Sequence, residues 1–176
     1  MSNTVSPPWL VALKGLPGCG KSTVAATLSR SFGWPIVDKD DIQDAIDAHL
    51  AASDGPAYEI MFRVARSQLR QGLSVIVDSP LWKQTYDNAR ALAEEQHACL
   101  AVIECRCADE RVWRQRIEAR KGAGLPARRT TSWESLLAYR SRYELNPYEI
   151  TVQHLVIETD TDRTDIVSLV RSRLGM

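Results

Sequence analysis

A nine-residue segment, GLPGCGKST at positions 15–23, restricts the fold of this chain more than any other part of the sequence. It matches the pattern G-x-x-x-x-G-K-[ST], in which glycines let successive backbone N–H groups turn inward around phosphate oxygens. Residues 9–14 (WLVALK) predict a buried strand before the segment, and residues 23–32 carry apolar side chains at helical spacing after it. This order of strand, loop and helix predicts a phosphate site at a helix N-terminus; an ordinary glycine-rich turn is the alternative.

Every residue of this segment is a candidate for binding a nucleotide, and ATP and Mg²⁺ are the expected cofactors. We expect the Lys21 ammonium to reach the β- and γ-phosphates and to assist catalysis, and the Ser22 hydroxyl to ligate Mg²⁺. The backbone amides of the segment would also stabilise a thiolate at Cys19, which predicts a cysteine open to oxidation. The complete candidate set is Gly15, Leu16, Pro17, Gly18, Cys19, Gly20, Lys21, Ser22 and Thr23.

Strand-like and helix-like segments alternate along the chain. Short apolar runs predict strands at 9–14, 34–38, 73–78, 99–105 and 152–157. Helical spacing predicts helices at 23–32, 40–50, 58–70, 84–96, 109–120, 133–145 and 164–174, the third after a break at Gly55-Pro56 and the last from a Thr164 cap. The alternation predicts an α/β protein, a three-layer sandwich around a five-stranded parallel sheet.

No stretch of the sequence reads as a linker that would divide the chain. Its 176 residues therefore predict a single domain over 1–176. Residues 121–131 contain two glycines and a proline and show no periodicity, which predicts a lid segment within that domain.

Composition narrows the classes of partner. Lys plus Arg and Asp plus Glu both number 22, so the net charge is zero, which argues against a large nucleic-acid surface. The four cysteines form no C-x-x-C pair, and Cys105 and Cys107 are expected in the core. Residues 1–8 do not resemble a signal peptide, and no apolar run approaches the roughly 20 residues of a membrane span. We expect a cytoplasmic protein, a monomer or homodimer, without a membrane partner.

Carboxylates follow two of the predicted strands, at the sheet edge where parallel sheets bind ligands. Asp40 and Asp41 come after the strand at 34–38. We expect Asp40 to accept the proton of an attacking hydroxyl, with Asp41 as the second candidate and a helix cap as the alternative for either. Asp78 ends the strand at 73–78 and is expected to hold Mg²⁺; a polar strand end is the alternative.

Arginines gather on the predicted helix at 109–120 and in the segment after it. Arg116 and Arg120 are four residues apart and share one helical face. Beside a loop they predict a lid that closes guanidinium groups over a phosphoryl group, and a solvated basic face is the alternative. The three histidines receive no catalytic role, and Trp82 is a candidate for lining an acceptor pocket.

Four segments together resemble the small P-loop kinases, a group that includes polynucleotide 5′-hydroxyl kinases, chloramphenicol phosphotransferase, gluconate and shikimate kinases and adenylate-kinase-like enzymes. These segments are GLPGCGKST, VDKDDI, VIVDSP and WRQRIEARKG. The best-matching pattern is the polynucleotide-kinase-like branch, whose xDDxxR segment implies that Asp40 is the general base, although Gln43 stands where that branch has arginine. The resemblance also implies that Arg116 lies near adenine, Arg120 on the phosphates, and residues 158–162 near adenine.

The resemblance implies a kinase that moves the γ-phosphoryl group of ATP·Mg²⁺ to a hydroxyl of a small-molecule acceptor. The alternative with the same chemistry is a polynucleotide or nucleoside 5′-hydroxyl kinase, which Gln43 and the neutral net charge disfavour, so nucleic acid is the second choice of partner. The alternative of another class is a non-catalytic nucleotide-binding switch or an ATPase. The N-K-x-D motif of GTPase switches is absent from the sequence, and the sequence does not specify the acceptor.

Overall fold

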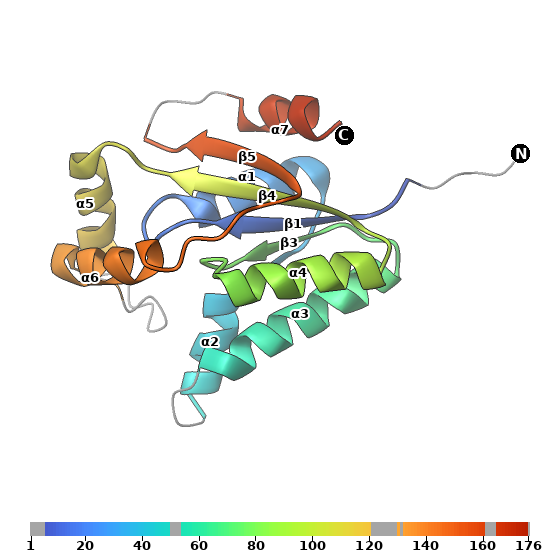
Figure 1. The fold of residues 1–176 in the computed structure, drawn as a ribbon, viewed down its shortest axis with the longest axis horizontal. Coiled ribbons are helices and arrows are strands. Elements are labelled where there is room, and N and C mark those ends of the chain that lie inside the picture. The colour runs from blue at the N-terminus through green and yellow to red at the C-terminus, as the bar shows by residue number, and fades with distance from the viewer. Residues whose placement is uncertain (1–5, 50–53, 121–129, 131, 161–164, 176) are drawn as a thin grey trace, which may run out of the picture.

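The computed structural model describes residues 6–49, 54–120, 130, 132–160 and 165–175. These residues form one sheet of five parallel strands in the order β2-β3-β1-β4-β5, with helices on both faces (Figure 1). The predicted α/β class and the five-stranded parallel sheet are confirmed. The strands are β1 Trp9–Lys14, β2 Ile36–Asp38, β3 Val75–Asp78, β4 Cys99–Arg106 and β5 Gln153–Glu158.

The helices lie in the connections between these strands, except for α7, which follows β5. One outer layer contains α1 and α7, the other contains α3 and α4, and α5 and α6 lie beyond the carboxyl end of β4 (Figure 1). Within the described residues the helices are α1 Lys21–Phe32, α2 Lys39–Asp47, α3 Asp54–Arg70, α4 Lys83–Glu95, α5 Glu110–Ala119, α6 Trp133–Glu144 and α7 Ile166–Leu174.

The core consists of two apolar layers separated by the sheet. Along β1, Val11 and Leu13 belong to the layer under α1 and α7, whereas Leu10 and Ala12 belong to the layer under α3 and α4. Successive side chains of a strand point to opposite faces, so a strand covered on both sides must be apolar throughout. This is why WLVALK reads as a continuous apolar run.

The starts of two predicted helices differ from the structure for local reasons. Helix α3 begins at Asp54, before the predicted break at Gly55-Pro56, because proline is tolerated in the first helical turn, where its missing N–H has no partner to lose. Helix α7 begins at Ile166 and is capped by Asp165, whose carboxylate accepts a 2.8 Å hydrogen bond from the Ser168 amide. The predicted Thr164 cap lies outside the described residues.

The strand order brings the predicted site residues to one edge of the sheet. The carboxyl end of β1 leads into the glycine loop, and Asp78 at the end of β3 is in register with Leu13 of β1 and with Asp38 of β2. The predicted lid at 121–131 lies outside the described residues except for Thr130. Among the helices that the structure describes, none combines the length and apolar character needed to cross a membrane.

Candidate active site

The glycine loop packs directly against the end of β4. Gly15 has a φ of 143°, and a Cβ atom at this position would lie 2.5 Å from the carbonyl oxygen of Cys105. Only glycine fits this close backbone approach. The loop ends at Gly20, which caps α1 without a side-chain hydrogen bond, so the first N–H groups of α1 remain available for a ligand.

Lys21 and Ser22 occupy the first turn of α1, facing the carboxyl edge of the sheet. The Lys21 ammonium donates hydrogen bonds to the carbonyl oxygens of Gly15 at 3.0 Å and Leu16 at 3.2 Å, which hold it across the loop. The Ser22 hydroxyl donates a 2.8 Å hydrogen bond to Oδ2 of Asp78. The two residues predicted to hold Mg²⁺ are therefore direct neighbours.

The three aspartates at the end of β2 and the start of α2 have different positions: one caps the helix, one lines a cavity and one is exposed. The Asp38 carboxylate accepts a 2.8 Å hydrogen bond from the Asp40 amide and so caps α2. Asp40 therefore does not take the capping role left open by the sequence. Its side chain lines the cavity above the glycine loop, the main cavity of this site, with Oδ1 3.0 Å from the Lys39 ammonium. Asp41 is exposed and does not line this cavity. The structure therefore brings the side chain of Asp40, and not that of Asp41, to this cavity.

Asp38 is a site residue that the sequence reasoning did not single out. Burial, together with the nearby charge of Asp78, raises the pKa of Asp38 to about 7. Two carboxylates at the ends of adjacent strands repel each other, and a bound cation would relieve that repulsion. The sequence feature that could have identified Asp38 is its position at the end of a predicted strand.

The donor atoms fit Mg²⁺, although they do not form a closed metal cage. Mg²⁺ binds oxygen ligands, usually one or two carboxylates together with substrate phosphates and water. Ser22, Asp78 and Asp38 supply a hydroxyl and two carboxylates, and all three residues line the same cavity. Within the described ranges no cluster of three or more His, Cys, Asp or Glu side chains could hold a metal by itself. Nucleotide phosphates would have to complete the coordination.

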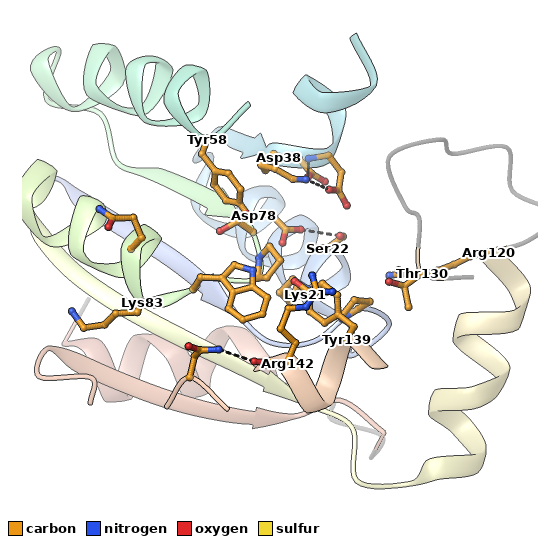
Figure 2. Close-up of a pocket in the computed structure, with 18 residues that line it drawn as sticks. Lys21, Ser22, Asp38, Tyr58, Asp78, Lys83, Arg120, Thr130, Tyr139 and Arg142 are labelled. Carbon is orange, nitrogen blue, oxygen red and sulfur yellow. Dashed lines mark hydrogen bonds and ion pairs between the residues drawn. The ribbon is translucent and has the colours of Figure 1, made fainter. Parts of the chain in front are cut away.

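A cavity of 630 Å³ opens above these residues (Figure 2). It extends well past the phosphate loop, and most of its far wall comes from α6 and from the segment between β3 and α4. Its lining consists of Pro17, Lys21, Ser22, Asp38, Lys39, Asp40, Tyr58, Asp78, Ser79, Pro80, Trp82, Lys83, Gln84, Arg120, Thr130, Tyr139, Arg142 and Asn146.

Several of these lining residues were not predicted. Tyr139 and Arg142 lie three residues apart on one face of α6, and Tyr58 comes from α3. An aromatic residue and an arginine at helical spacing were the only sequence signal, because nothing local shows that α6 folds back over the loop. Trp82 lines the cavity, as suggested from its place after Asp78.

Arg116 and Arg120 are on the same helix but reach different places. The Arg116 guanidinium donates to the carbonyl oxygen of Thr159 at 2.7 Å and to its hydroxyl at 3.0 Å. The same hydroxyl donates to the carbonyl of Cys19, so Arg116 joins the segment after β5 to the glycine loop. Arg120 is the C-cap of α5 and lines the main cavity.

Two expectations about side chains outside the main cavity have clear outcomes. Cys19 is 1% exposed and its burial raises the pKa of its thiol, so the prediction of an accessible, stabilised thiolate is wrong. Cys105 and Cys107 are buried, as predicted. His154 lies outside the main cavity with Nε2 3.1 Å from a carboxylate oxygen of Glu104.

Comparison with known proteins places this geometry in a family. Residues 10–145 match the family model of an AAA domain, from β1 to the end of α6. The chain belongs to this AAA domain family. The matched range contains the glycine loop, the aspartates of the cavity, and Arg116 and Arg120. A search among curated proteins found no match.

Solved structures share the fold of this AAA domain over nearly their full length. A provisionally assigned kinase from Chloroflexus aurantiacus j-10-fl is 22% identical, with a TM-score of 0.77 over 96% of this chain and 99% of that one. The APS kinase CysC of Mycobacterium tuberculosis, in complex with AMPPNP and APS, is 18% identical, with a TM-score of 0.66 over 97% and 99%. A gluconokinase from Sinorhizobium meliloti 1021 is 17% identical, with a TM-score of 0.62 over 96% and 93%. The resemblance to small P-loop kinases is thus confirmed at the level of the fold.

Proposed function

We propose that this AAA domain is a kinase that transfers the γ-phosphoryl group of ATP to a hydroxyl group of a small molecule. The observation that carries the proposal is the content of one cavity: a phosphate-binding lysine, an aspartate placed to act as a base, and room for a second substrate beside them. Lys21, Asp40 and Arg120 all line this cavity. A nucleotide-operated switch needs the first of these features but not the other two.

Each of these cavity residues has a role in the proposed phosphoryl transfer. The acceptor hydroxyl gives its proton to the Asp40 carboxylate while its oxygen bonds to the γ-phosphorus, and the bond from phosphorus to the β,γ-bridging oxygen of ATP breaks to release ADP. Mg²⁺, when held near Ser22 and Asp78, neutralises charge on the phosphates. Lys21 and Arg120 stabilise the negative charge that spreads over the transferring group.

Names of structural neighbours support the reaction type but differ in the acceptor. One neighbour is an APS kinase that was solved with AMPPNP and APS, and another is a gluconokinase. Both names denote transfer of a phosphoryl group, and the acceptors differ from each other. The names of these neighbours therefore support ATP as the phosphoryl donor more strongly than they support any one acceptor.

A polynucleotide or nucleoside 5′-hydroxyl kinase is the second candidate, and Gln43 argues against its polynucleotide form. Gln43 is fully buried, and its side-chain amide donates a 2.6 Å hydrogen bond to Asp47 within α2. It therefore presents no cationic group to a nucleic-acid phosphate at the position where the polynucleotide-kinase-like pattern has arginine. The zero net charge points the same way.

The test is phosphotransfer from γ-labelled ATP to pools of metabolites, nucleosides, antibiotics and 5′-hydroxyl oligonucleotides. We expect a labelled small-molecule product that depends on Mg²⁺ and disappears in Lys21→Ala and Asp40→Asn. Labelling of the oligonucleotides alone would favour the second candidate. Hydrolysis of ATP to phosphate with no labelled acceptor in any pool would reject the kinase reading in favour of an ATPase.

A further inference from the structure

One wall of the main cavity is built on a strained turn between β3 and α4. Leu81 is fully buried and has a φ of 55°, in the left-handed region that residues other than glycine rarely adopt. Its amide donates a 3.3 Å hydrogen bond to the Ser79 hydroxyl. Such strain persists only where the surrounding structure holds it in place, and it concentrates at ligand-binding sites.

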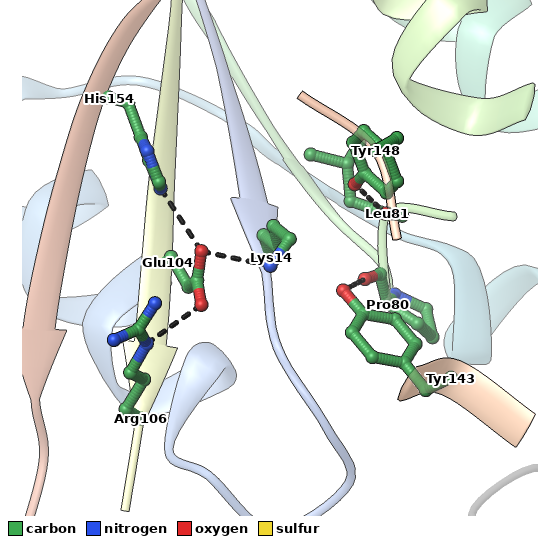
Figure 3. Close-up of polar contacts among 8 residues, drawn as sticks. All are labelled: Lys14, Pro80, Leu81, Glu104, Arg106, Tyr143, Tyr148 and His154. Atoms are coloured by element: carbon green, nitrogen blue, oxygen red, sulfur yellow. Dashed lines mark hydrogen bonds and ion pairs between the residues drawn. The ribbon is translucent and has the colours of Figure 1, made fainter. Parts of the chain in front are cut away.

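Two tyrosine hydroxyls hold this turn through hydrogen bonds to its backbone carbonyl groups (Figure 3). Tyr143, on α6, donates a 3.1 Å hydrogen bond to the carbonyl oxygen of Pro80, and Tyr148 donates to that of Leu81. The Lys14 ammonium lies 5.5 Å from the centre of the Tyr143 ring and 2.8 Å from Glu104. The turn is thus tied through Tyr143 to the end of β1, immediately before the glycine loop.

The turn and α6 together fix the indole ring of Trp82. Its ring centre lies 4.9 Å from that of Tyr143, in an edge-to-face contact, and 5.5 Å from that of Tyr139. The indole is partly exposed and lines the cavity together with the Tyr58 ring. A fixed indole presents a flat apolar surface, which suits a planar ring better than a flexible polyol chain.

Arg142 brings positive charge to the same wall, and it is available for a ligand. It reaches the cavity from the same helix as Tyr139 (Figure 2). Lys39 and Lys83, two other cations of the cavity, are paired with Asp40 at 3.0 Å and Asp87 at 2.5 Å. Within the part of the chain that the structure describes, no carboxylate lies within ion-pair distance of the Arg142 guanidinium.

We propose that the phosphoryl acceptor is an alcohol that carries both a planar ring and an anionic group, with its ring against Trp82 and its anion at Arg142. The proposal rests on the proposed kinase function and names the acceptor class of that same cavity. The Asp40 carboxylate and the metal-binding aspartates occupy the loop side of the cavity, where they would repel an anion. Arg142 is therefore the side chain that can compensate the charge of the acceptor.

Four alcohols that combine or separate the two features test the proposal: 4-(hydroxymethyl)benzoate, benzyl alcohol, glycolate and ethanol. Their binding to the intact chain with AMPPNP and Mg²⁺ is followed by ligand-observed NMR. We expect 4-(hydroxymethyl)benzoate to bind in the millimolar range, at least fivefold more tightly than any of the other three. Trp82→Leu checks that 4-(hydroxymethyl)benzoate binds at the proposed site, because its binding signal should be lost in this variant.

Matched variants of α6 separate the role of Arg142 from general charge. Arg142→Gln should lower the affinity for 4-(hydroxymethyl)benzoate about fivefold and leave that for benzyl alcohol unchanged. Arg140→Gln is the control, because Arg140 is two residues away, pairs with Glu144 at 2.7 Å and does not line this cavity. Equal or undetectable binding of all four alcohols, or the same loss in both variants, overturns the acceptor class. Failure of AMPPNP·Mg²⁺ itself to bind would instead reject the kinase function.

Discussion

The hydroxyl of Ser22, in the first turn of α1, donates a 2.8 Å hydrogen bond to the carboxylate of Asp78, the last residue of β3. The contact joins two segments that are 56 residues apart and places both side chains at the edge of the glycine loop. Both residues were predicted to hold Mg²⁺, and under the proposed function their oxygens would face a metal–nucleotide complex. Several measurable consequences depend on this arrangement and on the residues around it.

Asp78→Asn should weaken the Mg²⁺-dependent part of nucleotide binding. The amide keeps the hydrogen bond with Ser22 but loses the charge that attracts the cation. We expect the affinity for AMPPNP to fall about tenfold or more with Mg²⁺ and to change little with EDTA, as measured by calorimetry. An equal loss in both buffers would mean that Asp78 supports the fold of the loop and does not contribute to the metal site.

Lys21→Ala should remove most of the stabilisation by nucleotide. A ligand at one hundred times its dissociation constant raises the free energy of unfolding by about 2.7 kcal/mol. We expect saturating ATP·Mg²⁺ to raise the melting temperature of the natural protein by several degrees and to leave that of the variant almost unchanged. A natural protein whose melting temperature does not respond to ATP·Mg²⁺ would contradict the nucleotide site.

Asp40→Asn should lower turnover by about 10² to 10⁴ and leave the affinity for ATP near normal, because the acceptor loses the proton and ATP does not. Asp41→Asn is the matched control, since Asp41 is the next residue, is exposed and does not line the cavity. Steady-state kinetics with the acceptor identified by phosphotransfer distinguishes the two variants. If Asp41→Asn were the more damaging change, the assignment of the base would be wrong.

Asp38→Asn should stabilise the metal-free protein more at pH 8 than at pH 5. Burial and the charge of Asp78 raise the pKa of this carboxyl from 3.8 to about 7. The folded state therefore binds the Asp38 proton more tightly than the unfolded state, and folding stability falls as pH rises from about 4 through 7. Asparagine does not titrate, and its amide oxygen can still cap α2.

The gain from Asp38→Asn should be about 1 to 2 kcal/mol at pH 8, below the full value of the pKa shift because the side chain is only partly buried. Urea unfolding in EDTA at the two pH values measures it. An equal effect of Asp38→Asn at both pH values would contradict the raised pKa.

Arg120→Ala should lower kcat far more than it raises the KM for ATP. Its charge would act mainly in the transition state, where negative charge spreads over the transferring phosphoryl group. Arg111→Ala is the comparison, because Arg111 is exposed on the same helix and does not line the cavity. Proportional changes of kcat and KM in Arg120→Ala, or the same kinetics in both variants, would support a solvated basic face.

Most element types were predictable because their signals are local. The apolar run at 9–14 and the loop at 15–23 lie next to each other in the chain, so strand, turn and helix could be read together. The separate roles of Asp38, Asp40 and Asp41 could not be predicted, since all three are carboxylates near the start of one helix. Only the path of the backbone decides which of them caps α2, which faces the cavity and which stays exposed.

The sequence by itself determined the sheet, the phosphate loop and the neighbourhood of Lys21, Ser22 and Asp78. Glycine spacing acts within a few residues, and parallel strands bring their carboxyl ends to one edge whatever their order. The tertiary structure alone decided the acceptor side of the cavity. Its wall combines Tyr58, Trp82 and Arg142, which come from distant elements and meet because α6 folds back over the turn at Leu81. No local pattern encodes that docking, because it depends on packing between segments far apart in the chain.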